Sequence, residues 1–261
     1  MSDGTVHLSL NGGVASVTFD RPQARNAMTW AMYEQLGRIC EQLRGLQGDG
    51  SVRAVTFRGA GGQAFVAGTD IEQFKVFRTG EDGMAYEKQI DGCIAALESL
   101  PMPTVAVIEG WAIGGGLAIA AACDFRIATA ASRFGVPIAR TLGNCLSVAN
   151  LARLAAVFGM PRVRRMLLLA EVLSAGEALD CGFLLQVCDA ENIDSALAQL
   201  CERLTALAPV TQSVTKEALR RLVANGLPGD EDLIRRCYGS ADFREGVKAF
   251  VAKRHPVWQG G

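Results

Sequence analysis

Residues Thr104–Asp124, TVAVIEGWAIGGGLAIAAACD, decide the fold. The apolar stretch 104–108 predicts a buried strand, residues 114–116 a glycine turn, and residues 117–122 a helix of small side chains. The whole run is nearly long enough to cross a bilayer, but it contains Glu109 and several glycines, which favour a buried strand, turn and helix over a membrane span. The segment therefore predicts a non-membrane α/β protein.

The flanking sequence extends this pattern in both directions. We expect a hairpin from two alternating stretches around a glycine turn, and then further strands and helices. The expected strands are 6–10, 14–19, 52–57 and 125–128, and the expected helices are 29–46, one starting near Asp70, and 83–100. A strand–strand–helix unit thus recurs about twice, and from Ser147 onward the pattern is almost wholly helical. We predict a core over residues 1–190 and a C-terminal helical region over residues 191–261.

Composition excludes several classes of function. The formal net charge is −1, which provides no basic field for nucleic acid. The chain has 8 cysteines but no CxxC pair, so we expect free buried thiols in a reducing cytoplasm and no metal centre.

Two loops in this sequence are suited to act on a carbonyl group. The glycine turn 114–116 lets a ligand approach the backbone, and the start of the following helix presents free N–H groups. The loop 65–70 also links a strand to a helix, which Asp70 is expected to cap, and its N–H groups can supply a second donor. Together the loops predict a site that stabilises an oxyanion.

Six segments, in order and at compatible spacing, make the chain resemble the crotonase (enoyl-CoA hydratase/isomerase) superfamily. They are residues 21–28 (RPQARNAM), 65–71 (FVAGTDI), 108–124, 134–137 (FGVP), 174–182 (SAGEALDCG) and 242–250 (DFREGVKAF). The resemblance covers nearly the whole chain and implies a spiral of ββα units followed by a C-terminal helical region used for assembly into trimers or hexamers.

The resemblance also implies the ligand and its contacts. The backbone N–H groups of Thr69 and Gly115 would form the oxyanion hole for an acyl-CoA thioester, and coenzyme A would enter only as part of the substrate, with no separate cofactor. Residues expected along the CoA are Arg25, Ala27, Ala67, Asp70, Ile71, Phe250 and Lys253, the last two at positions where a neighbouring subunit touches CoA in relatives.

The chain departs from the hydratase pattern at the residues that transfer protons. Relatives that hydrate enoyl-CoA use two glutamates, and the matching positions here are Ala118 and Ile138. Neither side chain exchanges a proton. The resemblance therefore argues against two-glutamate hydration, and also against Δ3,Δ2-enoyl-CoA isomerisation, which depends on the second glutamate.

The loop 138–147 offers a different possibility. It resembles the loop of aryl-CoA dehalogenases, with Cys145 where those enzymes have a nucleophilic aspartate. One interpretation places Asn144, Cys145 and Ser147 at the acyl end of the substrate. The alternative is a small buried cysteine before a helix capped by Ser147. Arg140 binds a substrate carboxylate or is a solvated surface charge.

Three hypotheses for the function remain open at this point. The first is a CoA-thioester enzyme that stabilises an enolate in its oxyanion hole. The second is a catalytically degenerate acyl-CoA-binding homotrimer. The third is a lyase, decarboxylase or thioesterase that uses the oxyanion hole with water or a substrate group as acid/base, or a lyase, dehalogenase or thioesterase that uses the loop of Asn144, Cys145 and Ser147.

Overall fold

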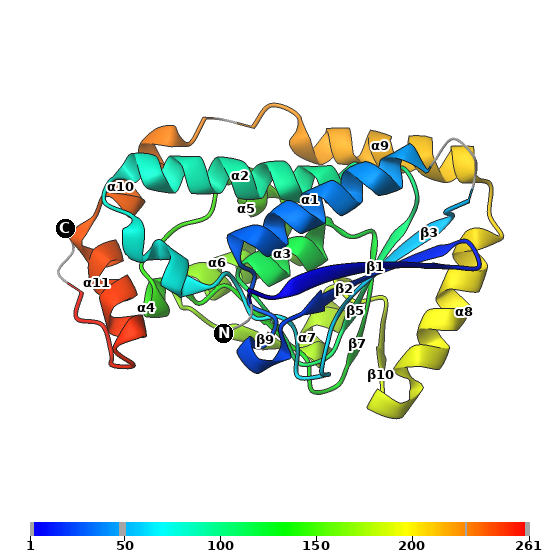
Figure 1. Cartoon of the computed structure of the whole chain (residues 1–261), viewed down its shortest axis with the longest axis horizontal. Helices are drawn as coiled ribbons and strands as arrows, with labels where there is room; N and C mark the ends of the chain where they lie inside the picture. Colours follow the sequence, from blue (N-terminus) through cyan, green and yellow to red (C-terminus); the bar gives the residue numbers. More distant parts are fainter. Residues whose placement is uncertain (1–2, 47–50, 228, 259–261) are drawn as a thin grey trace.

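The computed structural model describes residues 3–46, 51–227 and 229–258, and within them two sheets form the core (Figure 1). The larger sheet has the order β1-β2-β3-β5-β7-β10 and the smaller one β4-β6-β8-β9. The larger comprises β1 (Thr5–Asn11), β2 (Val14–Asp20), β3 (Ala54–Gly59), β5 (Thr104–Ile108), β7 (Phe125–Thr129) and β10 (Gln186–Cys188). The smaller comprises β4 (Ala64–Val66), β6 (Trp111–Ile113), β8 (Arg133–Gly135) and β9 (Val172–Ser174). All pairs are parallel except β1–β2 and β8–β9.

The chain winds between the two sheets as a spiral. In each turn the first strand joins the larger sheet and the second joins the smaller sheet, as in β3 and β4, β5 and β6, and β7 and β8. The predicted α/β class and ββα unit are confirmed, but the unit occurs three times in the described residues and not twice. The second strands have only three residues each, which is too short for alternation to be visible in sequence.

Helices cover both faces of the larger sheet. In Figure 1, α1 and α2 lie across one side, and α8 lies on the other. Two buried clusters match these layers, a large one beneath α1, α2 and α3 and a smaller one beneath α8. The helices are α1 (Trp30–Gly45), α2 (Gly80–Glu98), α3 (Gly115–Ala122), α4 (Ile138–Thr141), α5 (Val148–Phe158), α6 (Met160–Leu168), α7 (Ala175–Asp180), α8 (Ile193–Thr205), α9 (Pro209–Ala224), α10 (Glu231–Tyr238) and α11 (Ala241–Val251), with 3-10 turns η1 (Pro22–Ala24), η2 (Ile71–Val76) and η3 (Ala190–Asn192).

Most predicted elements and caps are confirmed. Thr29 caps α1 by accepting from the Met32 N–H, and Asp70 caps η2 by accepting from the Glu72 N–H. The expectation of an almost wholly helical chain after Ser147 is largely confirmed by α5 to α11, but it missed the strands β9 and β10. Both strands have three residues, and pairing with strands distant in sequence stabilises them.

The C-terminal helices return to the first half of the chain. The helix α10 contacts α2, and α11 contacts η2, so residues after 230 lie near the loop 67–70. The predicted boundary at Ala190 falls between β10 and α8. None of the helices in the described part of the chain has the length and hydropathy needed to cross a bilayer.

Candidate active site

The two predicted carbonyl-binding loops lie side by side. One follows β4 and the other follows β6, and these strands are parallel neighbours, so both loops emerge at the same edge of the smaller sheet. Gly68 has φ 103° and Gly114 has φ 55°, conformations that side chains disfavour. A Cβ on Gly114 would lie 3.8 Å from the Gly68 Cα. The fold thus brings Thr69 and Gly115 together as the sequence predicts.

The backbone N–H groups of Thr69 and Gly115 are available to a ligand. Met28 donates to the Gly68 carbonyl at 2.9 Å and accepts from the Asp70 N–H at 2.8 Å. This parallel pairing turns the Thr69 N–H away from Met28. Gly115 is the first residue of α3, where N–H groups have no partner within the helix. In the described part of the chain, no acceptor takes either N–H.

A network of hydroxyl groups positions both loops. The Thr69 Oγ1 lies 2.9 Å from the Tyr33 hydroxyl and 3.0 Å from the Tyr86 hydroxyl. The Tyr33 hydroxyl also lies beside Gly115, since a Cβ there would come within 2.4 Å of it. Burial raises the pKa of both phenols above the usual range, so they remain neutral donors.

A cavity of about 100 Å³ adjoins these N–H groups. Its walls are largely apolar, with Thr69, Glu87 and Asn144 among the polar side chains and the Gly115 main chain at one edge. The remaining side chains that line it include Ile71, Phe74, Tyr86, Ile90, Ile113, Ala118, Ile138, Thr141, Leu142, Leu146 and Asn150. Ala118 and Ile138 both line this cavity, and neither side chain carries a titratable group.

Sequence reasoning missed Glu87, the buried carboxyl group of this cavity. It lies on α2 and is 3% exposed. Its Oε1 accepts a hydrogen bond from the Tyr238 hydroxyl at 2.5 Å, and its Oε2 accepts from the Ser147 N–H at 3.2 Å. Burial raises the pKa of Glu87 to about 7, which the bond from Tyr238 partly offsets and the neighbouring Asp91 reinforces.

A signal for Glu87 is present in the sequence. The buried residues of α2 are Gly83, Tyr86, Glu87, Ile90, Cys93, Ile94 and Leu97. Glu87 therefore lies within an apolar stripe of helical period, where a carboxylate is unusual.

The raised pKa of Glu87 makes stability depend on pH. Burial disfavours the ionised form, so the folded state binds the proton more tightly than the unfolded chain. The stability that this tighter proton binding contributes is fully present below about pH 4.5, the ordinary pKa of a glutamate. It is lost as pH rises through about 7, the pKa of Glu87 in the folded protein. We expect the free energy of unfolding of Glu87→Gln, relative to wild type, to rise by roughly 3 kcal/mol across this window.

Urea unfolding of both proteins at a series of pH values measures this difference. A difference that stays constant with pH would show that Glu87 does not titrate with a raised pKa.

The loop 140–147 is only partly at the cavity. Asn144 lines it, its Nδ2 donates to the Tyr238 hydroxyl at 3.3 Å, and its Oδ1 is buried without a partner in the described residues. Cys145 is not among the lining residues. Its hydrogen bond with Cys237 and its burial raise the pKa of the thiol, which disfavours the nucleophilic thiolate.

Ser147 and Arg140 also do not line the cavity. Ser147 caps α5 by accepting from the Asn150 N–H at 3.2 Å, and its Oγ donates to Asp91 at 2.8 Å. The Arg140 side chain is exposed.

The residues expected along the CoA form two groups, one near the small cavity and one in the C-terminal region. Residues 25–28 run beside residues 67–70, with the Ala67 N–H donating to the Arg25 carbonyl at 3.1 Å. Ala67 and Ile71 line the small cavity, and Asp70 pairs with the Arg21 guanidinium at 2.7 Å. Phe250, near the end of α11, and Lys253, just beyond it, are exposed and border neither this cavity nor the larger one described next.

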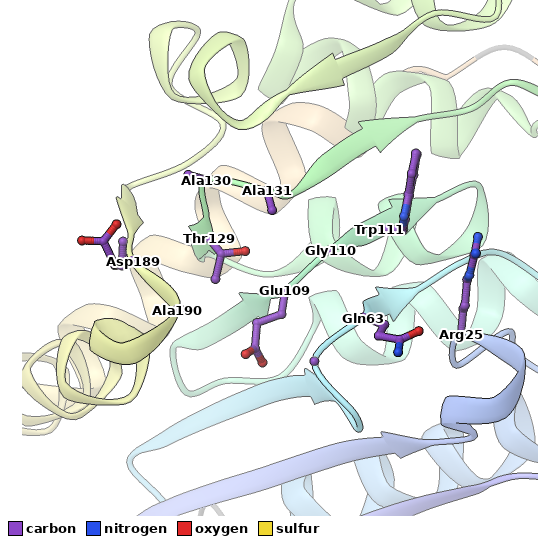
Figure 2. Close-up of a pocket in the computed structure, with 12 residues that line it drawn as sticks. Arg25, Gln63, Glu109, Gly110, Trp111, Thr129, Ala130, Ala131, Asp189 and Ala190 are labelled. Carbon is purple, nitrogen blue, oxygen red and sulfur yellow. The ribbon is translucent and has the colours of Figure 1, made fainter.

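Arg25 lies at a second, larger cavity of about 590 Å³ (Figure 2). Arg25 and Trp111 stand on one side of it, and Asp189 on the other. Glu109 also lines it, but its carboxylate is held by the Arg58 guanidinium at 2.6 Å.

Known proteins are similar to this chain over nearly its whole length. Residues 9–261 match the protein family described as Enoyl-CoA hydratase/isomerase. The short-chain-enoyl-CoA hydratase of Clostridium acetobutylicum is 30% identical over 97% of each chain. The 1,2-epoxyphenylacetyl-CoA isomerase of Escherichia coli is 32% identical over 95% of each chain. A crystal structure of methylmalonyl CoA decarboxylase complexed with 2S-carboxypropyl CoA superposes with a TM-score of 0.86, at 25% identity over 100% of each chain.

Proposed function

The chain belongs to the enoyl-CoA hydratase/isomerase family, and we propose that it binds a short acyl-CoA thioester and stabilises the enolate of that thioester. The N–H groups of Thr69 and Gly115 hold the carbonyl oxygen. The observation that carries the proposal is a pair of N–H groups, from two adjacent loops at one largely apolar cavity, that no acceptor among the described residues takes. Removing one such donor in other enzymes typically costs about 3 kcal/mol of transition-state stabilisation.

The cavity supports a short acyl group. Its volume of about 100 Å³ is small beside the 590 Å³ of the cavity at Arg25. Branched and aromatic side chains such as Ile90, Ile138 and Phe74 form the walls, so the acyl group is expected to be small and mainly apolar.

The CoA moiety is proposed to leave the cavity along the paired segments 25–28 and 67–71. Ala27, Ala67, Asp70 and Ile71 would follow the pantetheine and adenine through their backbone groups, and Arg25 would meet a phosphate. Phe250 and Lys253, exposed on the C-terminal region, are proposed to reach the CoA of a neighbouring subunit.

Self-association as a trimer or hexamer forms part of the proposal. The helix α9 has no buried residue in the single chain, and Val210 and Leu222 are 73% and 77% exposed. Apolar exposure of this kind on a helix favours a protein contact.

Standard hydration by two glutamates does not fit the side chains at the cavity. Ala118 and Ile138 supply no proton acceptor. A second candidate, an acyl-CoA-binding trimer without turnover, is favoured by the same two residues. Chemistry by the Cys145 thiol is less well supported, because the thiol contacts Cys237 and its pKa is raised.

Isotope-edited infrared spectroscopy of a bound thioester tests the oxyanion hole. We expect the carbonyl stretch of ¹³C-labelled butyryl-CoA to move to lower frequency on binding, because two N–H donors polarise the C=O bond. A thioether analogue that lacks the carbonyl should bind about tenfold more weakly.

The measurement uses wild-type protein, with free CoA as the control ligand. An unshifted carbonyl in a bound thioester would contradict the oxyanion hole, and failure to bind any of a panel of acyl-, enoyl- and aroyl-CoA thioesters would overturn the proposed function.

A further inference from the structure

Glu87 is the one carboxyl group among the residues that line the small cavity. It faces the same space as the N–H groups of Thr69 and Gly115. The helix α2 that carries it contacts α3, whose first residue is Gly115. A thioester whose oxygen is held by the N–H groups therefore places its acyl carbons within the cavity that Glu87 borders.

We propose that Glu87 is the catalytic acid/base of this site, removing a proton from the carbon next to the thioester carbonyl and returning it. The inference rests on the proposed function, since it requires a bound thioester. The C–H bond breaks, its proton passes to a Glu87 carboxylate oxygen, and its electron pair forms the enolate double bond. Negative charge develops on the thioester oxygen between the two N–H groups. Return of the proton to the same carbon restores the substrate, and return to the next-but-one carbon of an enoyl group shifts the double bond.

The hydrogen bonds of Glu87 suit this role. Each carboxylate oxygen accepts one bond, from the Tyr238 hydroxyl or from the Ser147 N–H, which leaves lone pairs free to accept a proton. These two contacts fix the side chain from α10 and from the start of α5. Glu87 is a group that touches the substrate, whereas Tyr238 is a positioning residue.

The surroundings of Glu87 also give its carboxyl group a pKa suited to proton transfer. An acid/base residue works best when its pKa is close to the working pH, and burial has moved the pKa of Glu87 to about 7. Among the groups that face it, Asp91 and Asp230 carry like charge and raise its pKa, while Tyr238 lowers it. The other titratable neighbours are Tyr33 on α1, Tyr86 on α2, Cys145, and Cys237 on α10.

Deuterium exchange at the carbon next to the carbonyl tests the proposal. Butyryl-CoA is incubated in D2O with wild-type protein, Glu87→Gln and the control Glu98→Gln, and deuterium uptake is followed by mass spectrometry while calorimetry measures binding. Glu98 lies on the same helix, pairs with Arg153 at 3.0 Å and does not line the cavity. We expect Glu87→Gln to lose at least about 100-fold in exchange rate with binding within about threefold, and Glu98→Gln to match wild type.

The pH profile gives a second, independent readout that does not need Glu87 to be replaced. Wild-type exchange should fall as pH drops below about 7, when Glu87 becomes protonated. Tyr238→Phe removes the hydrogen bond that lowers the pKa of Glu87, so the fall in exchange rate at low pH should begin at a higher pH than in wild type.

The outcomes distinguish failure of the proposed role of Glu87 from failure of the proposed acyl-CoA-binding function. Binding and exchange by wild type with an equal rate in Glu87→Gln would overturn the role of Glu87 but not the site. Binding without exchange by wild type at any pH would also overturn it. Absence of binding would overturn the proposed function first.

Discussion

Replacing Gly116 with alanine is expected to abolish acyl-CoA binding and to lower the melting temperature sharply. A Cβ at this position would lie 2.0 Å from the Val66 carbonyl oxygen and 2.7 Å from the Val66 Cβ. Neither the strand β4 nor the first turn of α3 can yield locally, because both belong to the buried core. The two must separate, and we expect a loss of about 3 kcal/mol or more.

Separation of these elements also moves the Gly115 N–H away from the Thr69 N–H, so the oxyanion hole is lost with the packing. Calorimetric binding of butyryl-CoA and thermal unfolding check both effects.

Gly37→Ala is the matched control for this change. Gly37 lies within α1, and a Cβ there would meet no atom within 4 Å. Alanine favours helix over glycine, so this variant should gain up to about 1 kcal/mol of stability and bind normally. Normal binding and stability in Gly116→Ala would show that β4 and α3 are not in the close contact described.

Asn26→Ala is expected to cost about 4 kcal/mol in the free energy of unfolding. Asn26 is fully buried and has φ 57°, a conformation that asparagine tolerates better than alanine. Its Nδ2 donates to the Ala60 and Ala64 carbonyls at 2.9 and 2.8 Å, and its Oδ1 accepts from the Arg21 N–H at 2.9 Å. Alanine leaves all three backbone groups unsatisfied.

Urea unfolding measures this loss. Asn26→Asp keeps the acceptor but places a carboxylate oxygen against the Ala60 and Ala64 carbonyl oxygens in a buried site, so it should be no more stable than Asn26→Ala. Asn225→Ala, at an exposed helix end with φ −77°, should change stability by less than about 0.5 kcal/mol. A small effect of Asn26→Ala would show that the three hydrogen bonds contribute little.

Much of the fold could be predicted because its elements carry local signals. The strand over residues 104–108 matches β5 residue for residue, since five consecutive buried positions between turn residues leave no ambiguity. The strands β4, β6 and β8 could not be predicted in this way. They have three residues each, and pairing between segments far apart in sequence holds them together.

The candidate site likewise has parts that carry local sequence signals and parts that depend on the tertiary structure. The loops around Thr69 and Gly115 were predictable because glycine at a strand–helix junction has a clear physical use. For Glu87 only its unusual place in an apolar stripe was visible, because nothing in the segment around it shows that Tyr238, roughly 150 residues later, would come within hydrogen-bonding distance. Only the tertiary structure brings α10 onto α2. This contact places Glu87, a polar residue in an apolar stripe, where it can act as an acid/base group.

The carbonyl-holding and acyl-facing halves of the cavity come from different parts of the chain. The first consists of main-chain groups after β4 and β6, whereas the second consists of side chains from α2 and the segment 138–146. Point mutations among the acyl-facing residues alter side chains but leave the main-chain N–H groups of the other half in place. During evolution, substitutions at the acyl end can therefore replace one reaction by another while the main-chain groups that bind the thioester carbonyl are retained. The chemistry of such a scaffold can diversify without first losing its substrate class.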